Sequence, residues 1–78
     1  MSQEEALKWI TELFEEPPGT FTPETALSSV PKWDSLGVLT LMAGLDEKFE
    51  ILVTADNILP MQKIGDIIEL LRKNGKLS

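Results

Sequence analysis

Few side chains in this sequence could carry chemistry, and one serine is the strongest candidate. The chain has no cysteine and no histidine, so it lacks a thiolate nucleophile, a sulfur metal site and the commonest general base. Ser35 follows Asp34 at the predicted start of a strongly apolar helix, where its hydroxyl should be exposed. The amide groups at a helix start also tolerate an attached phosphate. Taken alone, the pair favours an ordinary first-turn serine and a plain helix cap. We predict no catalytic residue and no metal site.

Length and charge narrow the class of protein. Residues 1–78 are enough for one small domain with one core. The formal charge of −6 argues against binding to nucleic acid and favours partners with basic surfaces. The first five residues do not resemble a signal peptide, and no apolar run approaches the ~20 residues of a membrane helix. We therefore expect a cytoplasmic monomer that does not insert into membranes.

Hydrophobic periodicity predicts the elements that must position Ser35. A capping box formed by Ser2 and Glu5 opens a first helix over 3–16, which Pro17 should stop. Asp34 caps a second helix that reaches Phe49. Two further elements are a short helix over 56–59, capped by Thr54, and a last helix over 64–73 that stops at Gly75. The predicted fold is all-α: a small bundle of three longer helices and one short helix.

Residues 20–33 form a long connection in this scheme. We expect an ordered loop, because Phe21 and Leu27 offer apolar anchors. Gly44 in the middle of the second helix suggests a close approach of another backbone, or a helix that must adjust. The inward stripes of the helices predict this core: Ile10, Leu13, Phe14, Leu41, Leu45, Phe49, Ile64, Ile67, Ile68 and Leu71.

The segment Trp33–Gly37, with Asp34-Ser35-Leu36 at its centre, is similar to the attachment site of acyl carrier proteins. The resemblance extends over essentially the whole chain. It includes a first helix closed by proline, the spacing to Phe49, a short segment near Asp56 and the closing run Ile64–Leu71. The other serines, Ser2, Ser28, Ser29 and Ser78, do not follow an aspartate at the start of an apolar helix.

Membership of that family would imply a carrier and not an enzyme. A phosphopantetheinyl transferase would attach phosphopantetheine covalently to Ser35, and partner enzymes would load acyl or aminoacyl groups on its thiol as thioesters. In the family, the aspartate at the position of Asp34 is associated with recognition by the transferase. Tethering the cargo raises its local concentration at each partner.

The second helix departs from the common pattern of the family. Carriers of fatty acid synthesis usually have acidic residues along its exposed face, whereas Gly37 and Thr40 are neutral here, and acidic character returns only near Glu47. Leu36 and Leu39 lie at the edge of the apolar stripe, where they would meet a partner. For Leu39, packing under the long loop is an equally good interpretation. We predict that these five residues form the docking surface for partners with basic or apolar patches, in a specialised pathway.

Two alternatives to the acyl carrier remain open at this point. The chain could be an aminoacyl carrier, like the D-alanine carriers of cell-envelope modification, whose second helix can also begin Asp-Ser-Leu-Gly. From a different class, it could be an acidic helical interaction module with an unmodified Ser35. The sequence does not identify the cargo, the pathway or the loading enzyme.

Overall fold

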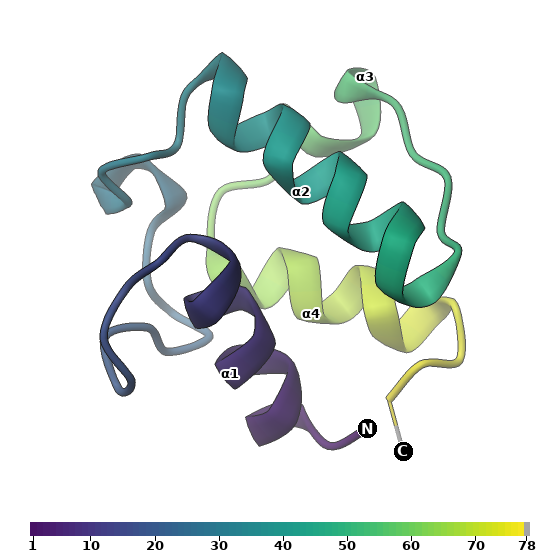
Figure 1. Ribbon diagram of the computed structural model, residues 1–78, viewed down its shortest axis with the longest axis horizontal. Helices are drawn as coiled ribbons and strands as arrows, with labels where there is room; N and C mark the ends of the chain where they lie inside the picture. The colour runs from purple at the N-terminus through teal and green to yellow at the C-terminus, as the bar shows by residue number, and fades with distance from the viewer. Residues whose placement is uncertain (78) are drawn as a thin grey trace.

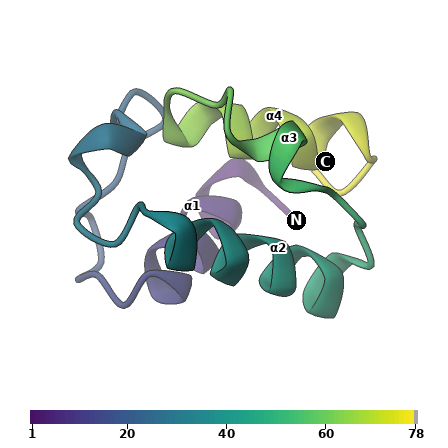
Figure 2. The same cartoon turned by 90° about the horizontal axis from the view of Figure 1, so that it is seen from above.

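The computed structural model describes residues 1–77 and is helical, as the sequence predicts (Figure 1). Its elements are α1 (Gln3–Leu13), a 3₁₀ turn η1 (Leu27–Ser29), α2 (Ser35–Phe49), α3 (Ala55–Ile58) and α4 (Ile64–Lys73). α1 packs against both α2 and α4, and α3 packs against α2. Figure 2 shows α2 along one side of the molecule and α4 along the other. The prediction of three longer helices and one short helix is confirmed; Ser78 lies outside the described residues.

The end of α1 differs from the prediction. The helix stops at Leu13 and not at residue 16, because Glu15 takes the left-handed conformation with φ of 57°. The Glu15 N–H then bonds the Glu12 carbonyl at 3.0 Å, and the Glu16 N–H bonds the Thr11 carbonyl at 3.0 Å. This pair of bonds is a Schellman motif. The helix therefore ends before the prolines that were predicted to stop it.

The other helix ends lie close to the predicted ones. The capping box at the start of α1 is present, and α4 has the predicted bounds, with Gly75 left-handed just beyond it at φ of 72°. α3 begins one residue early, at Ala55, directly after Thr54. The Thr54 N–H donates to the Asn57 side chain at 2.9 Å, and this contact closes the first turn of α3.

The long loop before α2 is ordered and fastened to the start of α4. Phe21 and Leu27 are buried, which confirms them as anchors. Three backbone hydrogen bonds of 2.8 to 2.9 Å complete the attachment, with Leu27 donating to Gln62, Ile64 to Thr25 and Gly65 to Pro23. A loop satisfied by such bonds can cross a small domain without leaving buried polar groups unpaired.

The predicted core is confirmed except at one position. Leu13 is only half-buried and packs against the edge of the core. The core also contains seven residues that the helical stripes did not single out: Ala6, Phe21, Leu27, Val30, Val38, Ile51 and Ile58. Most of the additions come from loops and from the short helix, where there is too little periodicity to reveal an inward face.

Gly44 marks the place where α1 approaches α2. A Cβ atom at this position would lie 3.0 to 3.3 Å from the side chains of Leu13 and Trp9. The predicted close approach is therefore real, but it involves side chains and not another backbone. Nearby, the Trp9 and Phe49 rings meet edge to face with 4.9 Å between centroids.

Candidate attachment site at the start of α2

Asp34 and Ser35 occupy the first turn of α2 as predicted. Asp34 is the N-cap residue, and its carboxylate accepts a hydrogen bond of 3.0 Å from the Gly37 N–H. This bond satisfies one of the amide groups that a helix start leaves without a partner. Ser35 is the first residue of the helix, and both side chains are exposed to solvent.

The hydroxyl of Ser35 is available for reaction. It makes no hydrogen bond within residues 1–77. By contrast, the Ser2 hydroxyl accepts from the Glu5 N–H at 3.2 Å, and the Ser29 hydroxyl donates to the Ala26 carbonyl at 2.7 Å. Ser28 is exposed, but it sits in the 3₁₀ turn and not at a helix start. Ser35 therefore offers an accessible hydroxyl beside backbone amide groups at the helix start.

Gly37 has a structural role that corrects its predicted place on the docking surface. It is buried, and a Cβ atom there would run into the carbonyl oxygen of Lys32 and come 3.0 Å from the carbonyl carbon. The same Lys32 oxygen accepts a 3.0 Å hydrogen bond from the Asp34 N–H. Gly37 is needed so that the turn before Ser35 can pack directly on the first turn of α2.

Two contacts hold the same turn against the end of α1. The Trp33 ring meets the Phe14 ring edge to face, with 5.9 Å between centroids. The Lys32 ammonium lies 3.7 Å from the Glu15 carboxylate, and both of these side chains are largely exposed. The aromatic contact is the stronger constraint, because an exposed ion pair contributes at most about 1 kcal/mol.

An apolar hollow of about 520 Å³ opens beside Ser35, between α2 and α3. Its walls are Trp33, Val38, Leu39, Ala55 and Leu59, and the polar side chains at its mouth are Asp34 and Ser35. The sequence analysis missed this hollow, since its α3 wall meets α2 only in the folded chain. The signal available was the apolar Leu59 at the predicted end of the short helix.

The outer face of α2 is apolar near Ser35 and acidic further along. Leu36 and Leu39 are 71% and 58% exposed, so Leu39 does not pack under the loop. Thr40 is half-buried and donates its hydroxyl to the Leu36 carbonyl at 2.9 Å, while Glu47 is exposed. Four of the five predicted docking residues thus reach the surface of one helix, and Gly37 does not.

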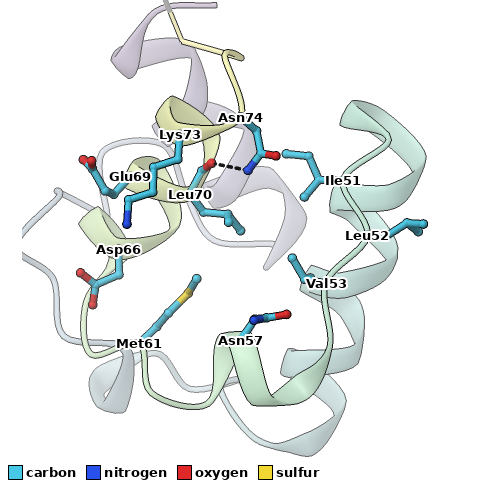
Figure 3. A pocket seen from close by; sticks show the side chains of 10 residues that line it. All are labelled: Ile51, Leu52, Val53, Asn57, Met61, Asp66, Glu69, Leu70, Lys73 and Asn74. Carbon is cyan, nitrogen blue, oxygen red and sulfur yellow. Dashed lines mark hydrogen bonds between the residues drawn. The ribbon is translucent and has the colours of Figure 1, made fainter.

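A second hollow, of about 470 Å³, offers no comparable chemistry (Figure 3). It lies between residues 51–53, α3 and α4, and shares no lining residue with the hollow beside Ser35. The polar side chains around it include Asn74, which donates to the Leu70 carbonyl at 2.8 Å, and Asp66, which accepts from the Gln62 N–H at 2.8 Å.

Residues 1–77 contain no group of three acidic, cysteine or histidine side chains placed to hold a metal ion. In the same range, no helix is long and apolar enough to cross a membrane.

Comparisons with known proteins bear on the fold. No protein-family model matches the chain, and no curated protein sequence matches it. Among solved structures, it is similar to the solution NMR structure of a holo acyl carrier protein from Geobacter metallireducens, with a TM-score of 0.73. The two sequences are 24% identical, and the match covers 94% of this chain and 85% of that one. The chain therefore has the fold of an acyl carrier protein.

Proposed function

We propose that the chain is a carrier protein that holds acyl intermediates as thioesters on a phosphopantetheine arm attached to Ser35. The observation that carries the proposal is the free, exposed Ser35 hydroxyl at the capped start of α2, within a fold of the acyl carrier type. An attached arm would supply the thiol that this cysteine-free chain lacks.

The residues around Ser35 fit such a group. In the attachment step, a transferase would remove the hydroxyl proton while Ser35 Oγ forms a bond to the phosphorus of coenzyme A that carries the pantetheine. The phosphoanhydride bond to 3′,5′-ADP would break. The exposed helix start leaves room for the resulting phosphodiester, and its amide dipoles favour the negative charge. Asp34 opposes that charge, so we assign to it the capping of α2 and recognition by the transferase.

The hollow beside Ser35 favours acyl over aminoacyl cargo. Its walls are apolar side chains from α2, α3 and the preceding turn. An alkyl chain would be stabilised by leaving water there. An aminoacyl ammonium would lose hydration, and the apolar walls offer it no anionic side chain in return. We therefore rank the D-alanyl type of carrier second.

Mass spectrometry tests attachment directly. Incubation with a broad-specificity transferase, magnesium and coenzyme A should add the mass of one phosphopantetheine. Ser35→Ala should abolish the addition and leave the helical circular dichroism spectrum unchanged, while Ser28→Ala, at another exposed serine, should be modified normally. An unmodified wild-type chain would favour the interaction module instead, and labelling that survives Ser35→Ala would rule out Ser35 as the attachment point.

We further propose that the partners belong to a specialised pathway and not to bulk fatty acid synthesis. The support is the neutral, apolar start of α2, with Leu36 and Leu39 exposed where acidic residues would attract basic enzymes. Thr40→Glu should speed loading by a fatty-acid-type acyltransferase, and added salt should shrink the gain. Gly37→Asp is unsuitable for this test, because the position has no room for a side chain. If those enzymes already load the unchanged protein as fast as their own carrier, charge on this face does not select partners.

A further inference from the structure

A groove of about 370 Å³ runs along the side of α1, away from Ser35. The chain after α1 turns back beside the helix (Figure 1). Leu7 of α1 lines the groove together with Pro18 and Phe21 of the returning segment. Thr11 also lines the groove, and its hydroxyl donates a hydrogen bond of 2.7 Å to the Leu7 carbonyl. The floor of the groove is therefore apolar.

The rim of the groove is acidic, and its charged side chains form no ion pairs within residues 1–77. Glu4, Glu12 and Glu16 line it together with a single cation, Lys8. None of these four side chains makes an ion pair or a side-chain hydrogen bond within residues 1–77. The first 16 residues carry five acidic side chains and one lysine, a formal charge of −4, whereas the remaining 62 residues contribute only −2. The negative charge of the protein is therefore concentrated on α1 and the three residues that follow it.

We propose that this groove docks a basic amphipathic helix of a partner protein. The partner would place an apolar side chain between Leu7 and Phe21, and its lysine or arginine side chains would pair with the glutamates of the rim. An apolar anchor surrounded by complementary charge is the usual form of helix-in-groove recognition. The proposal does not depend on attachment of any group at Ser35.

Charge decides among the possible occupants. A second copy of this chain carries the same −6 charge, so its α1 face would be repelled. Anionic lipid surfaces and nucleic acids would be repelled for the same reason. A basic helix would instead be steered toward the groove and would neutralise carboxylates that have no ion-pair partner among residues 1–77.

The site is separate from the attachment site. The α1 groove shares no lining residue with the hollow beside Ser35 or with the outer face of α2. A partner bound at α1 would therefore leave the start of α2 open to a second protein. In a carrier, this arrangement would let one protein retain the chain while another acts at Ser35.

The test is a titration of the ¹⁵N-labelled protein with a synthetic peptide that forms a Lys/Leu amphipathic helix. A Glu/Leu peptide of the same length is the control for charge. We expect the largest amide shift changes at Leu7, Gly19 and Phe21 with the basic peptide, weaker binding at higher salt, and no binding of the acidic peptide. Changes centred on α2, or no binding at low salt, would overturn the proposal.

Matched variants separate the groove from general attraction to an acidic protein. Glu12→Gln with Glu16→Gln removes two rim charges, and we expect a three- to tenfold loss of affinity, on the order of two exposed ion pairs. Asp46→Asn with Glu50→Gln removes the same charge from exposed positions at the end of α2 and should leave the affinity nearly unchanged. Leu7→Ala should also weaken binding, because it shortens the apolar wall. Equal losses in the two charge variants would mean that no specific groove is used.

Discussion

Replacing Gly37 with alanine tests whether the turn before Ser35 requires a residue without a Cβ atom at position 37. The new Cβ would overlap the Lys32 carbonyl oxygen, which cannot turn away freely because it accepts the Asp34 N–H. Removing this overlap requires a backbone shift, either at residue 37 or at Lys32. Overpacking of this kind costs about 1 to 3 kcal/mol, and a fixed backbone atom places the cost near the upper end. Alanine returns at most about 1 kcal/mol through its higher helix propensity. The expected net loss is about 2 kcal/mol.

Gly44 supplies a matched control in the same helix. A Cβ there meets only the ends of the Leu13 and Trp9 side chains, at 3.0 to 3.3 Å. These side chains can adjust by small rotations, so the gain in helix propensity should offset most or all of the strain. Gly44→Ala should therefore be neutral or slightly stabilising, even though the chemical change is identical.

Thermal unfolding measures the loss of stability, and the rate of Ser35 modification measures the displacement of the turn. For a domain of this size, 2 kcal/mol corresponds to a fall in the melting temperature of roughly 8 to 16 °C. Because the shifted turn includes the residues just before Ser35, Gly37→Ala should also slow modification by the transferase, measured well below its melting temperature. Gly44→Ala should be modified at the normal rate. Equal stability and equal modification of the two variants would refute the reasoning.

Three further predictions concern stability. Glu50 ends α2 in the left-handed conformation with φ of 57°, so Glu50→Gly should raise the free energy of unfolding by up to about 1 kcal/mol in urea titrations. Phe49→Ala should lower it by about 3 kcal/mol and shift Trp9 fluorescence to the red, since the two rings are in contact; an unchanged melting temperature would contradict the observed packing. Hydrogen bonds donated to the Glu5 carboxylate by the Ser2 N–H and by the Ser2 side chain keep the pKa of Glu5 below its ordinary value. A lowered folded pKa stabilises the protein above the unfolded pKa, and this contribution is lost as pH falls through the folded pKa. Glu5→Gln should therefore melt earlier than wild type at neutral pH, and the gap should close below about pH 4; a gap that persists in acid would exclude the charge as its cause.

Features encoded by neighbouring residues were predictable from the sequence. Asp34 was identified as a cap because an aspartate directly before an apolar helix can bond an amide within its first turn, and it does so with Gly37. The bounds of α4 followed from its apolar stripe and from Gly75. In each case the interacting groups are at most a few residues apart, so their spacing in the sequence is also their spacing in space.

Features that depend on contacts distant in the chain were missed. Gly37 looked like a neutral surface position, because the Lys32 carbonyl that covers it is placed by the fold of the preceding turn. The hollow beside Ser35 needs α3 to lie against α2, and the four-residue α3 has no periodicity from which its orientation could be read. The left-handed Glu15 was missed for a different reason. Glutamate is not a typical residue for that conformation, and the prolines that follow suggested a later stop.

The early end of α1 has consequences at Ser35. Had the helix continued to residue 16, Glu15 would have followed its axis. The Schellman turn instead redirects Glu15, which reaches Lys32. Phe14 keeps its helical hydrogen bond to the Ile10 carbonyl and contacts Trp33. Gly37 holds the same turn from the other side. The backbone that carries Ser35 is thus fixed from α1 and from within α2, whereas its hydroxyl makes no bond to the described chain. A fixed backbone with a free side chain presents the same hydroxyl geometry to each enzyme that must find it, without first breaking a contact of the fold.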